Sequence, residues 1–163
     1  MSPMDWAMRP LKRYAQFSGR APRAEYWWFY LAYIVLYVLL TILTRISAIF
    51  GILGIVYLGL IIPMIAVGVR RLHDTNRSGW WLLAPALPYF IGIALIFPAI
   101  MSGMAGGANP FSMGSLGAAG IFMLIGFVLA VAVLIFLIMP GTKGPNRFGD
   151  DPNGPGNLDE VFA

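Results

Sequence analysis

The residues best suited to chemistry lie together near the middle of the chain. Residues 70–81 read Arg-Arg-Leu-His-Asp-Thr-Asn-Arg-Ser-Gly-Trp-Trp and contain the only histidine, His73. An enzyme could use His73 as a base oriented by Asp74, with the following asparagine and arginine holding a phosphate. However, adjacent residues rarely project toward one point, and a single histidine without cysteine provides no metal-ligand cluster. We therefore expect no catalytic residues, no metal and no cofactor. A membrane-embedded enzyme acting on a phosphorylated or lipid substrate remains the remote alternative.

Two further polar stretches carry the same residue types. Residues 17–29 contain Arg20, Arg23 and Glu25, and residues 141–152 contain Arg147 and Asp150. Of the eleven Lys and Arg residues in the chain, nine are arginine. Arginine presents a planar, multi-donor fork that fits carboxylates and phosphates, but a genome rich in G and C would also raise the arginine content. Both explanations of the arginine excess stay open.

The elements that position these stretches must be membrane helices. The chain is 59% hydrophobic and 11% charged, whereas a soluble domain usually carries about 25% charged residues. Such a chain has too little polar surface for a soluble fold, so the composition predicts one integral membrane domain. The absence of cysteine excludes disulfides and thiolate metal sites.

Four apolar runs are long enough to cross a bilayer as helices, which predicts an all-α fold of four transmembrane helices. We expect spans at about residues 27–43, 48–69, 80–100 and 121–139. The chain then divides into a basic N-terminal arm (1–26), a transmembrane domain (27–139) and a Gly/Pro-rich acidic tail (140–163), largely disordered beyond 151. The charge-free residues 101–120 are predicted to form a loop.

Several local features refine this outline. Residues 4–16 form either a short interfacial amphipathic helix or a flexible basic arm. Pro63 is expected to kink the second span, and three prolines are expected to distort the third. The second and fourth spans are each followed by Asn-Arg-x-Gly, which leaves open a duplication of two helical hairpins.

The basic residues predict the orientation. Ten of the eleven lie in the N-terminal arm, the 70–79 loop or the tail, and Arg45 alone lies in the opposite loops. This bias predicts that both termini are cytoplasmic, with the three arginine-containing stretches forming a cytoplasmic cap. Four tryptophans would then anchor the helices at the same interface: Trp27, Trp28, Trp80 and Trp81.

The three polar stretches, at 17–29, 70–81 and 141–152, together resemble the family known as domain of unknown function 805. The resemblance covers about residues 14–152 in the family's order and spacing. It implies a small multi-helix protein of the bacterial inner membrane, and it brings no established activity or catalytic residues.

Two roles remain open for the polar stretches. In the first, their charges pair across stretches, with Glu25, Asp74 and Asp150 as the acidic partners. In the second, they bind anionic lipid headgroups or a protein partner of unknown identity. The candidate binding residues are Arg20, Arg23, Arg70, Arg71, Asn76, Arg77, Asn146 and Arg147.

Other classes of function fit less well. A small oligomeric transporter or channel is the alternative, although no Asp, Glu, Lys, Arg or His lies within a predicted span. Gly-rich helices favour a homo-oligomer. Nucleic acid is not an expected partner, since the basic residues lie in the headgroup zone and form no recognition fold.

Overall fold

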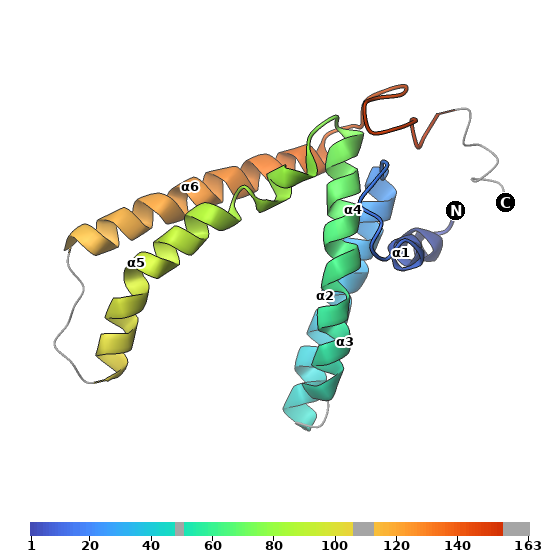
Figure 1. Cartoon of the computed structure of the whole chain (residues 1–163). Helices are drawn as coiled ribbons and strands as arrows, with labels where there is room; N and C mark the ends of the chain where they lie inside the picture. Colours follow the sequence, from blue (N-terminus) through green and yellow to red (C-terminus); the bar gives the residue numbers. More distant parts are fainter. Residues whose placement is uncertain (48–50, 106–112, 155–163) are drawn as a thin grey trace. The chain divides into compact units, whose positions relative to one another are not determined.

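The computed structural model describes residues 1–47, 51–105 and 113–154, and the statements below concern these residues. The chain forms two compact units, one of residues Met1–Gly79 with Leu137–Ala163 and one of residues Trp80–Phe136. The described regular structure is helical apart from one isolated antiparallel bridge between Asn146 and Gly149. Figure 1 shows the helices of both units.

The first unit contains four helices, α1 (Pro3–Lys12), α2 (Arg23–Ile46), α3 (Leu53–Gly59) and α4 (Ile61–Asp74). Of the two alternatives for residues 4–16, the structure has a helix, which covers Pro3–Lys12. The Ser2 hydroxyl accepts from the backbone N–H of Asp5, and the Asp5 carboxylate accepts from the backbone N–H of Ser2 at 2.7 Å. This capping box satisfies N–H groups that the first turn leaves free, and α1 then packs on α2.

The break between α3 and α4 follows from Pro63. Proline has no N–H, so it cannot bond the carbonyl four residues earlier, which belongs to Gly59. The hydroxyl of Tyr14 donates to that Gly59 carbonyl at 2.5 Å. A side chain from the N-terminal arm thus satisfies the acceptor that Pro63 leaves free, and the expected distortion lies at Leu60 between the two helices.

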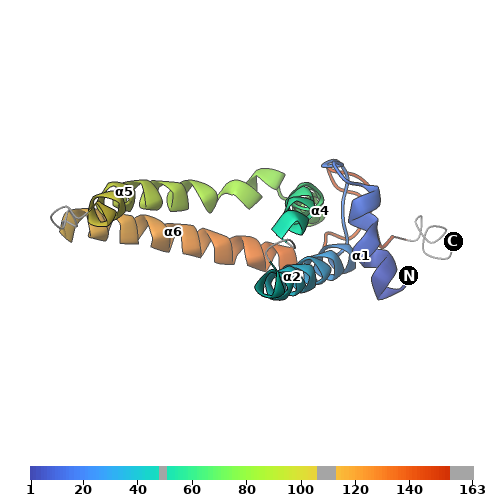
Figure 2. The same ribbon diagram turned by 90° about the horizontal axis from the view of Figure 1, so that it is seen from below.

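The second unit is a helical hairpin. A 3₁₀ helix, η2 (Gly79–Leu83), leads into α5 (Ala86–Met104), and α6 (Met113–Ile138) returns. Helices α5 and α6 run side by side in Figures 1 and 2, and a Cβ added at Gly126 would lie 3.1 Å from the Tyr89 ring. The prolines do distort this span, because its start is 3₁₀ and Pro98 lies inside α5, which is bent in Figure 1.

The predicted loop at 101–120 is wrong at both ends. Helix α5 continues to Met104 and α6 begins at Met113, while residues 106–112 lie outside the described part of the chain. The glycines in this stretch suggest a loop in water, but lipid offers no partner for exposed backbone groups and so favours helix. The predicted tail disorder beyond residue 151 falls mostly on residues 155–163, which also lie outside the description, while 152–154 form a turn.

Within the described residues, four helical stretches are long and apolar enough to cross a membrane: Arg23–Ile46, Leu53–Asp74, Gly79–Met104 and Gly114–Ile138. Burial is inverted relative to a soluble protein. The largest fully buried side chains include Arg70, Arg71, Glu25 and Asp74, while large apolar side chains along the spans are exposed. Exposed apolar helix surface with buried, paired charges is what a lipid solvent requires.

Four tyrosines recur at helical spacing along one face of α2: Tyr26, Tyr30, Tyr33 and Tyr37. Tyr26 is 6% exposed, whereas Tyr37 is 55% exposed. The ring of Tyr33 stacks on Tyr57 of α3, with centroids 4.4 Å apart. The ring of Tyr37 also approaches that of Tyr57, with centroids 5.7 Å apart, so this row of tyrosines packs α2 against α3 although Tyr37 stays partly exposed.

Candidate functional site

The candidate site is built around the C-terminus of α4. Asn76 has φ +58°, the left-handed conformation that ends many helices. Its N–H bonds the carbonyl of His73, and the N–H of Arg77 bonds the carbonyl of Leu72, which is the Schellman pattern. The sequence signal is an asparagine two residues after the last residue of the helix. This cap fixes the last turn of α4, and with it the side chains of Arg70, Arg71 and Asp74.

Arg71 binds the end of α6. Its Nε donates to the carbonyl of Leu137 at 3.0 Å, and its Nη2 donates to the carbonyl of Met139. Its Nη1 donates to the carboxylate of Asp74, and the side chain is fully buried. The last carbonyls of a helix lack intrahelical partners and carry partial negative charge. A buried guanidinium from α4 thus caps α6.

Asp74 lies between two arginines. One carboxylate oxygen accepts from Arg20, with Nε at 3.0 Å and Nη2 at 2.9 Å, and the other accepts from Arg71. Arg20 also donates to the carbonyls of Thr142, at 2.5 Å, and Gly144, at 2.7 Å. The carboxylate thus joins the segment before α2, the end of α4 and the segment after α6.

Arg70 and Glu25 form a second, separate pair. Arg70 Nη1 lies 2.8 Å from Glu25 Oε1, and both side chains are fully buried. Arg9 of α1 lies 3.8 Å from the other carboxylate oxygen. Two fully buried opposite charges at this distance attract strongly, so the contact is a buried ion pair. This pair ties α4 to α2, next to α1.

The segment after α6 closes the site from the other side. The backbone N–H of Thr142 donates to the carbonyl of Asp74 at 2.8 Å, and the Asn146 amide donates to the carbonyl of His73 at 3.0 Å. Arg147 donates to the carbonyl of Asn76 and lies over the Phe148 ring. These bonds cap α4 as Arg71 caps α6. We call Arg20, Arg70 and Arg71, together with Glu25 and Asp74, the arginine cluster.

His73 and Asp74 face different partners. His73 Nδ1 lies 3.1 Å from the carbonyl of Gly19, which can only accept, so Nδ1 carries the proton. The His73 ring stacks on Phe148, with centroids 3.9 Å apart. The Asp74 carboxylate is directed to the arginines instead. No group of three or more potential ligand side chains that could hold a metal occurs among the described residues.

The remaining candidate residues lie at the edge of the arginine cluster. Arg23 is exposed, and its Nε donates to the carbonyl of Met139 at 3.1 Å. Arg77 is half-buried and donates to the carbonyl of Thr75. Asp150 is exposed and has no ion pair within the described ranges, whereas its neighbour Asp151 lies 4.0 Å from Arg20 Nη2. The carboxylate that approaches the cluster from the tail is therefore that of Asp151, not Asp150.

The four tryptophans differ in exposure. Trp80 is 78% exposed, Trp28 and Trp81 are each 40% exposed, and Trp27 is half-buried. Each follows a polar stretch and begins an apolar helical stretch, as expected for residues at a membrane interface.

Sequence reasoning missed the contacts made by main-chain atoms. Thr142 contributes through its backbone, and Tyr14 acts on a carbonyl that only the helix break exposes. The proline at position 63 was the available signal for the second contact. No pattern in the sequence distinguishes Asp151 from Asp150.

Comparisons with known proteins agree with this architecture. The family described as "Protein of unknown function (DUF805)" matches residues 14–150. The chain is 32% identical over 151 residues to the inner membrane protein YhaI of Escherichia coli, covering 91% of this chain and 96% of YhaI. It is 34% identical over 155 residues to the inner membrane protein YhaH of Escherichia coli, covering 91% and 97%. No solved structure matches the chain. The protein belongs to the DUF805 family of inner membrane proteins.

Proposed function

We propose that this protein is a non-catalytic inner membrane protein that binds anionic lipid headgroups at its cytoplasmic face. Both termini are cytoplasmic in this proposal. The arginine cluster acts as the fixed framework of that face, and the exposed basic side chains around it make the lipid contacts. The two roles considered for the polar stretches thus fall to different residues.

The observation that carries the proposal is the partition of the basic residues between buried and exposed positions. Arg20, Arg70 and Arg71 are at most 6% exposed, and their contacts are with carboxylates and carbonyls of the chain itself. Around them, four basic side chains are exposed: Lys12, Arg23, Lys143 and Arg147. The exposed acids at this end of the described first unit are Asp5 and Asp150. This end of the described first unit therefore exposes more basic than acidic side chains, and the surplus of positive charge favours anionic headgroups.

Helix α1 supports a position at the membrane surface. Met4 is 69% exposed and Met8 is 46% exposed, four residues apart on one face of the helix. Lys12 extends the same row with a charge. A short helix with an apolar row and basic residues is typical of segments that lie in the interface of anionic membranes.

The test is lipid selectivity in a defined bilayer. The protein is placed in nanodiscs of zwitterionic phosphatidylcholine with a minor share of anionic phosphatidylglycerol, and native mass spectrometry identifies the lipids released with it. We expect phosphatidylglycerol to be enriched over its share, and the enrichment to fall as salt is raised. Neutralising all four exposed basic residues to Gln should remove it, whereas Arg45→Gln at the other end of α2 should not. Lipids retained in the bulk ratio would refute the proposal.

The orientation has its own test. A reporter active only in the periplasm, fused after the last residue, should be silent, and activity would refute the cytoplasmic placement.

A further inference from the structure

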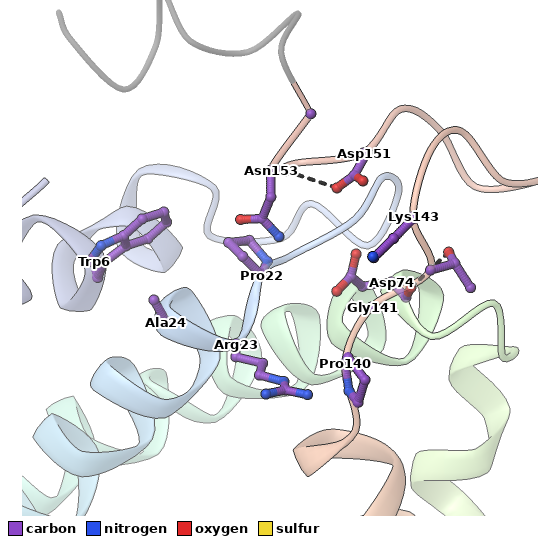
Figure 3. Close-up of a pocket in the computed structure, with 12 residues that line it drawn as sticks. Trp6, Pro22, Arg23, Ala24, Asp74, Pro140, Gly141, Lys143, Asp151 and Asn153 are labelled. Carbon is purple, nitrogen blue, oxygen red and sulfur yellow. Dashed lines mark hydrogen bonds between the residues drawn. The ribbon is translucent and has the colours of Figure 1, made fainter.

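The first unit contains a cavity beside the arginine cluster. Its volume is about 620 Å³, within the range of small-ligand sites, roughly 300–1,000 Å³. The walls come from α1, from the start of α2, from Asp74 at the end of α4, from residues 140–143 after α6 and from the turn at 151–154. Figure 3 shows these walls, with Trp6 on one side and Lys143 on the other. The cavity therefore lies where the three polar stretches of the sequence meet.

Two basic side chains line the cavity, Arg23 from α2 and Lys143 from the segment after α6. The Lys143 side chain is exposed and has no ion pair within the described ranges. Arg23 uses Nε to bind the carbonyl of Met139, and a guanidinium carries four further N–H donors. Both cations thus retain donors for an external anion.

The acidic residues of the cavity wall already have partners. Asp74 accepts from Arg20 and Arg71. Asp151 accepts from the backbone N–H of Asn153 at 2.9 Å, which together with the N–H of Gly144 holds the pKa of its carboxyl below the usual value despite partial desolvation. Asp151 therefore stays ionised, but Arg20, 4.0 Å from it, and Arg71 offset the two negative charges of Asp74 and Asp151, so Arg23 and Lys143 leave the cavity wall with a net positive charge.

The backbone adds to this preference. The N-cap of α2 is Pro22, and within the described part of the chain no side chain caps this helix end. A helix start without a side-chain cap, together with the positive end of the helix dipole, favours an anion near Ala24, which lines the cavity. The rest of the wall includes apolar surface from Trp6, Pro22 and Pro140 (Figure 3). Such a site suits an anionic group attached to an apolar or neutral body.

We infer that this cavity binds one phosphate group, a monoester or diester, with Arg23 and Lys143 as its cationic ligands. The inference rests on the proposed function. That function assigns lipid contacts to the exposed basic side chains of one face, and the inference assigns one phosphate group to one cavity within that face. The phosphate belongs either to a lipid headgroup or to a soluble phosphate ester, since both present the same oxygens. Guanidinium and ammonium groups bind these oxygens by charge-assisted hydrogen bonds.

The experiment compares two variants of equal charge. Arg23→Gln/Lys143→Gln removes both cavity cations. Lys12→Gln/Arg147→Gln removes two cations of the lipid-binding face that lie outside the cavity, so it should lower the lipid enrichment in nanodiscs but keep the one phosphate compound bound in the cavity. Native mass spectrometry titrates each detergent-solubilised protein with phosphatidylglycerol, or with glycerol phosphate as the soluble probe. We expect one tightly bound phosphate compound in the wild type and in the control pair. The cavity pair should bind it at least about tenfold more weakly, since a hydrogen bond to a charged group contributes about 1.5–3 kcal/mol.

Every outcome decides the inference. Binding of the lipid alone assigns a headgroup site, and binding of both probes assigns a phosphate-ester site open to water. Wild-type affinity of the cavity pair would overturn the inference. Equal weakening by the two variant pairs would also overturn it, but would leave a diffusely charged lipid-binding face. No stoichiometric binding of either probe by the wild type would also overturn it, while nanodisc enrichment still tests the proposed function. If the cavity pair fails to fold, Lys143→Gln alone decides, because Lys143 lies outside the arginine cluster, and unchanged affinity would refute the site.

Discussion

Replacing Asp74 by asparagine should be among the most destabilising single changes in this chain. The carboxylate accepts from two buried arginines, Arg20 at 2.9–3.0 Å and Arg71. An amide keeps one oxygen acceptor, but its NH₂ group then faces a guanidinium, donor against donor. Two buried positive charges lose their counter-charge. Removing one partner of a buried ion pair costs about 3–5 kcal/mol, a large part of a typical stability of about 5–15 kcal/mol.

Thermal unfolding of the purified protein in a mild detergent measures this loss. For a chain of this size, about 3–5 kcal/mol corresponds to a drop of roughly 6–20 °C in Tm. Hydrogen–deuterium exchange shows where the structure loosens. Residues 141–149 are held by hydrogen bonds from Arg20 and to the end of α4, so their amides should exchange faster in the variant. Asp150→Asn is the matched control. It removes the same charge at an exposed position and should shift the free energy of unfolding by less than about 0.5 kcal/mol.

A coupling measurement separates the ion pair from general damage. If Asp74 stabilises the buried charge of Arg20, then Arg20→Gln should lower the free energy of unfolding less in the Asp74→Asn variant than in the wild type. The expected difference between the two losses is about 0.5–3 kcal/mol. The reasoning would be refuted by an Asp74→Asn variant as stable as Asp150→Asn. It would also be refuted by additive effects of Arg20→Gln and Asp74→Asn, because the two groups would then not interact.

Three further outcomes are expected. Arg71→Lys should lose about 2–4 kcal/mol of stability in detergent melts, because one ammonium cannot reach three acceptors, whereas Arg45→Lys at an exposed position should melt like the wild type. Gly141→Ala would place a Cβ 2.6 Å from the carboxyl carbon of Asp74, and should cost about 1–3 kcal/mol. Its control is Gly54→Ala, where a Cβ meets nothing within 4 Å, and a lower Tm there than for Gly141→Ala would contradict the packing argument. The Ser2 side-chain and backbone hydrogen bonds hold the pKa of Asp5 below 3.8. The capping box should therefore persist above pH 3.8 and open only as the pH falls below it. The measurement is the protection of first-turn amides of α1 against hydrogen exchange, relative to the intrinsic rate at each pH. Loss of that protection already near pH 6, as the pH is lowered, would refute this.

The four spans were predictable because run length and bilayer thickness leave little choice. The ends of the runs were less predictable. Gly103 lies in α5, and Gly117 lies in α6, where a soluble chain would favour a turn. In lipid the cost of an unpaired N–H exceeds the small helix penalty of glycine, so the helices continue. Composition patterns learned from soluble proteins therefore place the start of this loop too early, at residue 101, and its end too late, at residue 120.

The pairing of charges was predictable as a principle but not in its detail. Three stretches at one end of the helices, each with arginines and acids, must neutralise one another if they are buried. The sequence does not reveal that Glu25 takes Arg70 while Asp74 takes Arg20 and Arg71. The reason is geometric, because Arg70 and Arg71 are adjacent on α4 and so point about 100° apart around the helix. One therefore faces α2 and the other faces the end of α6.

The contacts with carbonyls explain why arginine rather than lysine fills the arginine cluster. In lipid the hydrophobic effect does not drive one helix against another, so polar contacts at the helix ends contribute more. Arg71 satisfies a carboxylate and two carbonyls of a helix end at once, and Arg20 satisfies a carboxylate and two loop carbonyls. Only a planar fork with five donors reaches such a set from one side chain. Genome composition could raise the number of arginines along the chain, but it would not direct them to these acceptors. The geometry therefore favours defined pairing as the reason for arginine at the buried positions, and it leaves the exposed Lys12 and Lys143 where a simple point charge is enough.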